Sequence, residues 1–456
     1  MIKYETNSRK VKPGQTFVAI KGYTVDGHDY IDSAIKNGAT SVIAEKEVNV
    51  SVPVTVVDDS AKYFQEKLVK EYSDKYKNLK IVGITGTNGK TTSAYLTYQA
   101  LNLLGSKAAY IGTLGFMCDD YFEELPNTCP EILTIYKLLE YALDNKAEYV
   151  IMEVSSHALD LKRIEGINFE VCAFTNVTED HLDYHKTMDN YLECKLMILD
   201  YLKKDGVMLV NKDDEAGIKF AERFINTKTF GIGEADYDIE DFDIHPDYTD
   251  IKFKVENNEY NVTTNLTSKF NIYNYMTMFA IVNSLGFDAS SIISITKDLK
   301  HPKGRCETYK VKDGFAVVDY AHTPDAVLKV VTAYKELAKA RVITLVGCGG
   351  DRDPLKRPIM GNIASKYSDY VIFTSDNPRT EDPKKIMDDI IEGVSDDNYE
   401  IILDRREAIK KALDMIKKDD IVLLLGKGHE DYQIIGHDKI HLDDSEEILK
   451  YIKTSS

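Results

Sequence analysis

The sequence has no apolar run that approaches the roughly 18 residues needed to cross a bilayer. Its first residues, MIKYETNSRK, also lack the apolar core of a secretory signal, so we expect no export and no membrane insertion. The six cysteines are scattered and form no Cys-x-x-Cys pair. We therefore expect reduced thiols in a cytoplasmic protein.

A basic excess is missing too, because 57 Lys and Arg face 75 Asp and Glu, for a net charge of −18. Nucleic-acid-binding proteins usually carry the opposite balance, so nucleic acid is not an expected partner. Only 11 prolines and 26 glycines are present, which excludes collagen-like or linker-like material. The 456 residues are 43% hydrophobic and 29% charged, as in an ordinary globular protein, and suffice for about three domains.

Apolar, strand-like runs alternate with helical spacing along most of the chain, which predicts an α/β protein. We expect a small N-terminal α/β domain over residues 1–78, and a central ATPase-type, mostly parallel sheet over 79–301. A C-terminal Rossmann-like α/β domain is expected over 302–456. Residues 237–264 alternate apolar and polar side chains and predict an antiparallel patch. Ligands are expected in the loops that follow the parallel strands.

Residues 81–92, IVGITGTNGKTT, read as a strand, a glycine-rich turn and the start of a helix. Such a turn offers phosphates free N–H groups and a positive helix end. Lys90 would reach the outer phosphates and the Thr91 hydroxyl would bind Mg²⁺. The spacing is G-x-x-G-K-T, because Ile84 stands where the usual motif has its first glycine. Nucleotide binding is predicted, although the loop alone does not distinguish ATP from GTP. The expected contacts are Gly86, Thr87, Asn88, Gly89, Lys90, Thr91 and Thr92.

Further motifs follow in a fixed order: IMEVSSHALDLKR (151–163), FTNVTEDHLDYH (174–185), VDYAHTPDA (318–326), GCGGDRD (347–353), SDNPRTEDP (375–383) and GKGHEDYQ (426–433). With TGTNGKTT they resemble the Mur ligase family, the ATP-dependent enzymes that build the peptide of bacterial peptidoglycan, and most closely its MurE type. The resemblance spans residues 8 to 433. It implies an amide ligase that adds meso-diaminopimelate to UDP-N-acetylmuramoyl-L-alanyl-D-glutamate; we expect a monomer, although the sequence itself does not determine the oligomeric state. The reaction would pass through an acyl phosphate and release ADP and phosphate.

The resemblance also implies two Mg²⁺ sites and four catalytic residues, Lys90, Glu153, His181 and Lys195. Thr91 and Glu153 would hold one Mg²⁺, and His181 the other together with Lys195, carbamylated by CO₂. Glu153 ends an apolar strand, where an unpaired carboxylate is costly to bury. The alternatives are a structural salt bridge for Glu153, a structural His181, and for Lys195 a side chain that merely lies along apolar surface.

The remaining expected contacts also come from the resemblance. ATP would further contact Asn271, Asn274, Arg305, Asp319 and His322. The UDP end of the acceptor would meet Ser8, Tyr23, Thr24 and Val25, and its muramoyl peptide Asn127, Thr128, Cys129, Ser155 and Arg163. Cys129 stands where the family commonly has threonine.

The DNPR segment, Asp376, Asn377, Pro378 and Arg379, indicates which amino acid is added. Diaminopimelate has a second carboxylate that lysine lacks, and Arg379 with Arg352 could clamp it. Glu430 and the Gly426 carbonyl could accept hydrogen bonds from the distal ammonium. Surface ion pairs are the alternative for the two arginines.

Three other functions stay open. An accessory Mur-like ligase would use a different acceptor or amino acid, for example L-lysine. A folylpolyglutamate-type ligase shares the phosphate loop, but SRKV near the start and DNPR argue against it. A nucleotide-binding regulator without catalysis is disfavoured, because all four catalytic candidates are intact.

Overall fold

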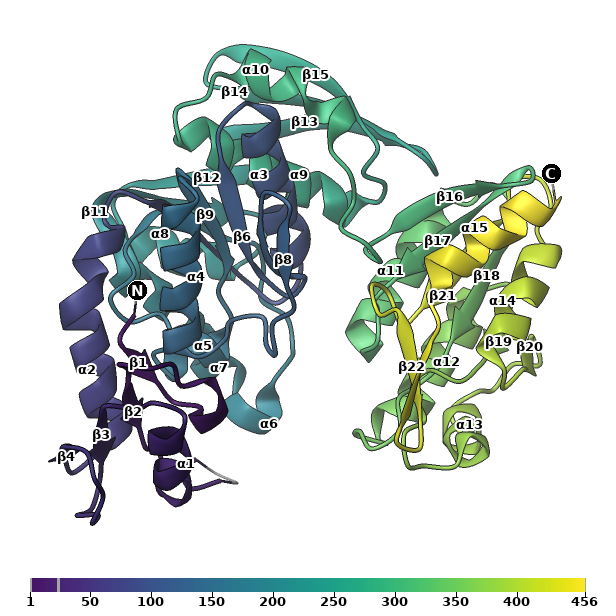
Figure 1. Cartoon of the computed structure of the whole chain (residues 1–456). Helices are drawn as coiled ribbons and strands as arrows, with labels where there is room; N and C mark the ends of the chain where they lie inside the picture. The colour runs from purple at the N-terminus through teal and green to yellow at the C-terminus, as the bar shows by residue number, and fades with distance from the viewer. Residues whose placement is uncertain (1, 23–24, 456) are drawn as a thin grey trace. The chain divides into compact units, whose positions relative to one another are not determined.

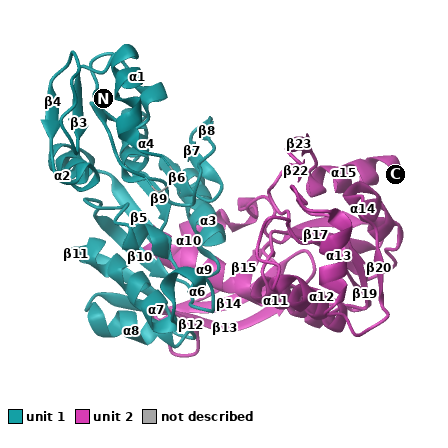
Figure 2. Ribbon diagram, turned by 90° about the horizontal axis from the view of Figure 1, so that it is seen from below, with its two compact units in different colours: residues 1–228, 284–286 teal, residues 229–283, 287–456 magenta. Residues whose placement is uncertain are grey.

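The computed structural model describes residues 2–22 and 25–455, and its chain divides into two compact units (Figure 2). The first unit holds residues 1–228 and 284–286, and the second holds residues 229–283 and 287–456. Among the residues described, no helix combines the length and the apolar character that crossing a membrane requires.

The first unit begins with a parallel sheet in the order β1-β2-β3-β4, flanked by two helices. These elements are β1 (Tyr4–Glu5), β2 (Thr16–Val18), α1 (Ile31–Lys36), β3 (Ser41–Ala44), β4 (Val54–Val56) and α2 (Ser60–Tyr72). Helix α2 begins at Ser60, because the Asp59 side chain caps it by accepting from the Lys62 N–H.

The N-terminal sheet shares its hydrophobic core with the rest of the first unit. Phe64 and Leu68 on α2 belong to the same buried cluster as Leu139 on the later helix α4. The Tyr76 hydroxyl also donates to the Tyr136 carbonyl at 3.1 Å. The expected domain boundary at residue 78 therefore runs through one continuous core and stays a prediction.

A second sheet of the first unit has the strand order β11-β10-β5-β9-β6-β7-β8. Strands β11 to β6 run parallel, and β7 and β8 add an antiparallel edge. The elements are β5 (Lys80–Thr85), α3 (Lys90–Leu103), β6 (Ala108–Gly112), β7 (Gly115–Cys118), β8 (Tyr121–Glu123), α4 (Ile132–Asp144), β9 (Tyr149–Glu153), α5 (Ser156–Asp160), β10 (Phe169–Phe174), α6 (Leu182–His185), α7 (Met188–Leu196), β11 (Leu202–Asn211) and α8 (Ala216–Arg223). The carboxyl ends of β5, β9 and β10 meet at one edge, where a parallel sheet places ligands.

The second unit opens with the antiparallel patch that the alternating pattern of 237–264 predicted. Strand β12 (Thr227–Ile232) pairs with β13 (Tyr237–Ile244), followed by β14 (Thr249–Val255) and β15 (Asn258–Thr264). Two helices follow, α9 (Lys269–Ser284) and α10 (Ala289–Ser294).

The C-terminal sheet has the order β16-β17-β21-β18-β19-β20, with only the edge strand β16 antiparallel. Its strands and the helices around it are β16 (Glu307–Val311), β17 (Gly314–Asp319), α11 (Pro324–Leu337), β18 (Val342–Val346), α12 (Lys356–Tyr367), β19 (Tyr370–Phe373), α13 (Pro383–Ile391), β20 (Tyr399–Ile401), α14 (Arg405–Asp414), β21 (Ile421–Leu425) and α15 (Asp444–Ser455). Strands β22 (Tyr432–Ile435) and β23 (Asp438–His441) form a separate antiparallel pair.

Strand β21 explains why these strands read as unbroken apolar runs. Ile421, Leu423 and Leu425 pack beneath α11, α12 and α13. Val422 and Leu424 face the opposite side, which α14 and α15 cover (Figure 1). Both faces of each strand are therefore buried, as expected of a parallel sheet between helices. The predicted α/β class with mostly parallel sheets is confirmed.

A fully buried ion pair joins α14 to α15, and we expect the second unit to depend on it. Arg405 Nε and Nη2 lie 2.8 and 2.5 Å from the two carboxylate oxygens of Asp444, and neither side chain is exposed. Asp444→Ala leaves the Arg405 charge buried without its partner, so we expect the free energy of unfolding to fall by about 3–5 kcal/mol. Urea unfolding followed by circular dichroism measures this loss.

The matched control is Asp414→Ala, because Asp414 also joins α14 to α15, through the Tyr451 hydroxyl, but lies at the surface. Its loss should be much smaller, since exposed pairs contribute little. Equal losses in the two variants would contradict the prediction.

Candidate active site

The phosphate loop of the first unit is held by the segment that follows β10. Gly86 lies so close to Thr175 that a Cβ atom there would stand 1.9 Å from the Thr175 hydroxyl oxygen. The Thr175 hydroxyl donates to the Asn88 carbonyl at 2.6 Å, and the Thr87 N–H donates to the Asn176 carbonyl at 2.8 Å. The loop is thus shaped before any ligand arrives, and Lys90, Thr91 and Thr92 open α3 behind Gly89 as expected.

Two lysines converge on this loop. Lys90 Nζ donates to the Gly86 carbonyl at 2.8 Å, and Lys195 Nζ donates to the same oxygen at 2.9 Å. Lys195 is buried, and its Nζ lies 4.2 Å from the centre of the Tyr191 ring. Burial, and then the Lys90 charge, lower the pKa of Lys195 well below its usual range. Burial therefore favours the neutral form of the Lys195 amine, which lies beside the loop that is expected to receive the phosphates.

Glu153 has no exposed surface, and four donors satisfy its carboxylate. One oxygen accepts from the Tyr110 hydroxyl and, at 2.8 Å, from the Thr113 N–H. The other accepts from the Thr91 hydroxyl at 2.8 Å and from the Thr113 hydroxyl at 3.2 Å. A buried carboxylate is tolerated only with such partners. The salt-bridge alternative finds no support here, because all four donors are uncharged.

These oxygen donors fit Mg²⁺, which is usually bound by one or two carboxylates together with substrate phosphates. Thr91 and Glu153 are already in contact at the phosphate loop. Among the described residues, no group of three or more His, Cys, Asp or Glu side chains is arranged to hold a metal ion. A cation here would therefore need phosphate oxygens to complete its shell.

His181 lies apart from this pair. It precedes α6 with a left-handed backbone, and its half-exposed side chain is 3.5 Å from Asp180. Its ring is 6.2 Å from the ring of Tyr191, which also contacts Lys195. His181 and Lys195 thus flank one tyrosine, and their role as a second Mg²⁺ site stays a prediction.

Near the N-terminus, a pocket of about 390 Å³ contains both Ser8 and Val25 of the predicted acceptor site. Arg9, Phe17 and Tyr30 also line it. Tyr23 and Thr24 lie outside the described residues. The structure therefore brings together two of the four positions expected to contact the UDP end.

Among the positions expected to contact the muramoyl peptide, Thr128 is linked to Glu153 through Thr113. The Thr128 hydroxyl is 3.0 Å from the Thr113 hydroxyl, which in turn contacts Glu153. Arg163 donates to the Cys129 carbonyl at 3.1 Å.

The other members of this group differ in exposure. Asn127 is exposed, whereas Ser155 is partly buried and caps α5 through the Ala158 N–H. Burial raises the pKa of the Cys129 thiol to about 12, so Cys129 is a neutral, enclosed side chain.

In the second unit, the predicted nucleotide contacts Arg305 and His322 gather around Tyr320. The Arg305 guanidinium is 4.6 Å from the Tyr320 ring, and the rings of His322 and His429 are 4.4 and 4.9 Å from it. Burial and the neighbouring cations lower the pKa of His429 to about 4, so it is neutral at pH 7. The cluster offers the flat faces of its aromatic rings and the positive charge of Arg305, and this combination suits a nucleotide.

The other nucleotide candidates are held more rigidly. Asp319 ends β17, and its carboxylate accepts from the Cys306 and Ala321 N–H groups, both at 2.8 Å. Asn271 and Asn274 are buried on α9 and bond to each other at 2.8 Å.

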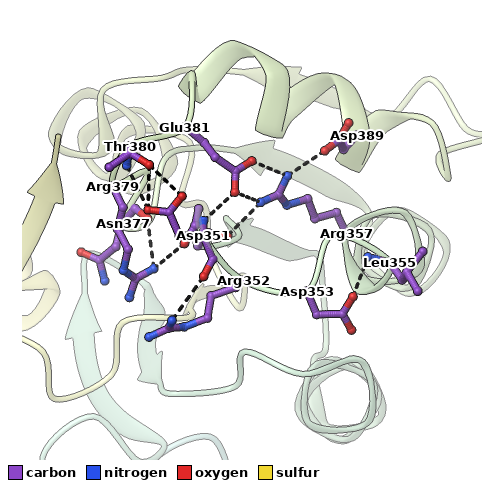
Figure 3. Close-up of polar contacts among 12 residues, drawn as sticks. Asp351, Arg352, Asp353, Leu355, Arg357, Asn377, Arg379, Thr380, Glu381 and Asp389 are labelled. Atoms are coloured by element: carbon purple, nitrogen blue, oxygen red, sulfur yellow. Dashed lines mark hydrogen bonds and ion pairs between the residues drawn. The ribbon is translucent and has the colours of Figure 1, made fainter. Parts of the chain in front are cut away.

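The predicted amino-acid pocket forms where loops follow β18, β19 and β21. Asn377 Nδ2 donates to Glu430 Oε2 at 2.8 Å. Arg379 Nη1 donates to the Gly350 carbonyl at 2.8 Å, so DNPR contacts the GGDRD loop (Figure 3). Arg352 donates only to the adjacent Asp351 carbonyl, at 3.2 Å. Neither Arg379 nor Arg352 has an acidic partner in an ion pair among the described residues, which weighs against surface pairing.

The rest of the DNPR segment is buried. Asp376 and Pro378 are buried, and Gly426 donates its N–H to the Asp319 carbonyl at 3.1 Å. Gly426 thereby links the amino-acid loops to β17, the strand that ends at the nucleotide candidate Asp319.

One buried arginine, Arg357, connects the loop after β18 with the loop after β19. Arg357 on α12 forms hydrogen bonds with both carboxylate oxygens of Glu381 at 2.8 and 2.9 Å, and with Asp389 at 2.7 Å. It also donates to the Gly349 carbonyl at 3.2 Å. Figure 3 shows Arg357 reaching between Glu381 and Asp389. Arg357 therefore holds these two loops in fixed positions relative to each other.

Sequence reasoning missed five residues that shape the site: Tyr110, Thr113, Tyr191, Arg357 and Lys427. Arg357 and Lys427 lie in or beside quoted motifs, so nearness to a motif could have indicated them. The first three act through contacts between distant elements, and no local pattern marks them.

Comparisons with known protein families place similarity along nearly the whole chain. The models described as "Mur ligase family, catalytic domain", "Mur ligase middle domain" and "Mur ligase, glutamate ligase domain" match residues 4–80, 84–282 and 304–428. A UDP-N-acetylmuramoyl-L-alanyl-D-glutamate–2,6-diaminopimelate ligase from Fusobacterium nucleatum is 43% identical, over 97% of this chain and 92% of its own length. One from Clostridium botulinum is 40% identical, over 99% and 95%. A solved structure of a ligase with the same name has a TM-score of 0.71 and 32% identity, covering 99% of this chain and 94% of its own.

The Glu153 network leads to a test on Tyr110. Tyr110→Phe removes one donor from the carboxylate but keeps the ring, so Glu153 is less firmly oriented toward a cation. Loss of such a supporting contact typically costs 10–100-fold in metal affinity or activity. We expect the Mg²⁺ concentration for half-maximal ATP turnover to rise by about that factor.

Tyr98→Phe is the matched control, because the Tyr98 ring lies 6.2 Å from the Tyr110 ring in the same aromatic group. The same Mg²⁺ titration should leave this variant unchanged. An unchanged Tyr110→Phe curve would refute the assignment of Glu153 to the cation.

Proposed function

The chain belongs to the Mur ligase family, and we propose that it joins meso-diaminopimelate to UDP-N-acetylmuramoyl-L-alanyl-D-glutamate in peptidoglycan synthesis, at the expense of ATP. Relatives carrying that name align with it over nearly their full lengths. The product would be the UDP-muramoyl tripeptide.

The choice of amino acid rests on one observation, the arrangement of Arg379, Asn377 and Glu430. Asn377 bonds to Glu430, and Arg379 lies two residues further along the same loop. An arginine suits the distal carboxylate of diaminopimelate, and a glutamate suits its distal ammonium. Lysine would leave the arginine without an anion, and sites built for a polar group reject analogues that lack it.

The first half-reaction would occur on the first unit. The acceptor's glutamate carboxylate attacks the γ-phosphorus of ATP and ADP leaves, which forms an acyl phosphate. The prebuilt loop around Gly86 offers N–H groups to the phosphates, and Lys90 lies against the same loop. Such a transfer needs positioned phosphates and balanced charge more than it needs an acid or a base.

In the second half-reaction, the amine of diaminopimelate attacks the acyl carbon and loses a proton to solvent, and phosphate leaves from the tetrahedral intermediate to give the amide. The second unit contributes to this step by orienting the amino acid. Asn377, Arg379 and Glu430 fix the end of diaminopimelate that does not react, so that the reacting amine is presented in one direction.

The proposal includes two Mg²⁺ ions, one at Thr91 and Glu153 and one at His181 and Lys195. When bound, Mg²⁺ would neutralise charge that develops on the transferred phosphoryl group. Lys195 is the residue that would be carbamylated. Burial lowers the pKa of its amine, and in the neutral form that amine would attack the carbon of CO₂, lose a proton and become an anionic oxygen ligand.

A cytoplasmic monomer is the remaining part of the proposal. All six cysteines are buried and free, which supports a reducing compartment.

Phosphate release from ATP tests the function directly. With the UDP-muramoyl dipeptide present, the protein should release phosphate with meso-diaminopimelate and at least about 100-fold more slowly with L-lysine. Arg379→Ala should lower kcat/KM for diaminopimelate by about 10–100-fold, because a charged hydrogen bond is lost, and leave the KM for ATP unchanged. Equal use of both amino acids by the wild type would refute the pocket assignment. No turnover with either would favour an accessory ligase with a different acceptor.

Carbamylation of Lys195 has a separate readout. With ¹³C-labelled bicarbonate, NMR should show one carbamate signal that is lost in Lys195→Ala together with nearly all activity. Lys203→Ala is the control, since Lys203 forms a surface ion pair with Glu170. A signal that persists in Lys195→Ala would assign the carbamate to another residue.

A further inference from the structure

Lys427 is a fully buried lysine in the loop after β21. It lies between Gly426 and Gly428, which both have left-handed backbones with φ of 108° and 52°. A Cβ atom on Gly428 would stand 2.5 Å from the Cβ of Tyr320, so the loop cannot shift freely. Burial of an ammonium group is costly unless partners surround it. The sequence therefore holds a charge at this place at some cost to stability.

Lys427 Nζ lies 5.5 Å from the centre of the Tyr432 ring, and its carboxylate and amide neighbours belong to the proposed amino-acid pocket. Lys427 Nζ lies 3.4 Å from Glu430 Oε2 and 3.4 Å from Asn377 Oδ1. Asp376 Oδ1 is 4.0 Å away. One ammonium group thus contacts the loop after β19 and the loop after β21 at the same time.

These contacts determine how the Asn377 amide points. Its Oδ1 accepts from Lys427 and from the Ile434 N–H at 2.9 Å, while its Nδ2 donates to Glu430 at 2.8 Å. If the Asn377 amide were flipped, its NH₂ group would face the donors Lys427 and the Ile434 N–H, and its oxygen would face the Glu430 carboxylate, which can only accept. Lys427 therefore favours a single orientation of Asn377, which in turn holds the Glu430 carboxylate.

Charge balance gives Lys427 a second effect. Two carboxylates, Asp376 and Glu430, face this one ammonium group. Burial raises the pKa of Asp376, whereas the charges of Lys427 and Arg405 act against that rise. Without Lys427 the two carboxylates would repel each other, and one would take up a proton or turn away.

We infer that Lys427 is a positioning residue of the amino-acid pocket, which holds Asn377 and Glu430 ready for the distal end of the amino-acid substrate without touching that substrate itself. This inference rests on the proposed function of the pocket. Lys427, the lysine of the GKGHEDYQ motif, would thus take part in selecting the amino acid rather than in binding ATP.

The test is Lys427→Met, which keeps most of the side-chain volume and removes the charge. In the phosphate-release assay, the KM for meso-diaminopimelate should rise about 10- to 100-fold, as expected for the loss of a charged hydrogen bond. The KM values for ATP and for the UDP-muramoyl dipeptide should stay within about twofold, because a purely structural defect would move all three. Lys410→Met is the control, since Lys410 is an exposed lysine paired with Asp414.

A double-mutant cycle separates positioning from a general loss of packing. If Lys427 acts through Glu430, then Glu430→Gln combined with Lys427→Met should raise the KM for diaminopimelate scarcely more than the larger single change. Multiplicative effects of the two changes would overturn the inference. A parallel rise of all three KM values would overturn it as well.

Two further outcomes of these experiments are a variant that does not fold and a wild-type protein that is inactive. If Lys427→Met does not fold, Lys427→Gln, which keeps a hydrogen-bond donor, is judged by the same three KM values. A wild-type protein that releases no phosphate with diaminopimelate would refute the proposed function, and with it this inference. Wild-type turnover with an unshifted variant would refute the inference alone.

Discussion

The Glu153 carboxylate, buried without an opposite charge, is the constraint around which the first unit is arranged. A carboxylate with no exposed surface must receive hydrogen bonds, and those of Glu153 come from α3, from β6 and from the turn after β6. The donors fix the phosphate loop from one side and, through Thr113 and Thr128, the segment expected to contact the acceptor from the other. The hydrogen bonds around one carboxylate therefore connect the phosphate loop with the segment that holds Thr128.

Much of the fold was predictable because parallel strands bury both faces. The run Ile421–Leu425 is apolar throughout, and it became the central strand β21. Residues 237–264 alternate, and they became an antiparallel patch. The hairpins β7–β8 and β22–β23 escaped prediction, because short strands at an edge carry little pattern.

The site was predictable where one short sequence motif contains the residues that the chemistry requires. The strand, glycine turn and helix at Gly86 to Thr92 formed as expected. The partners of Glu153 were not predictable, because Tyr110 lies 43 residues away and meets it only through the pairing of β6 with β9. Lys427 was overlooked for a different reason. Its motif was visible, but burial decides whether a lysine is a surface charge or a contact inside a pocket.

The core that α2 shares with α4 also has a consequence for the size of the acceptor. The pocket at Ser8 and the Glu153 network belong to one compact unit with a continuous interior. The span between them is therefore set by packed side chains rather than by a flexible connection. With the acceptor bound at both places, as proposed, the first unit would select acceptors by length, because one whose two ends are too close together or too far apart would not reach both places at once.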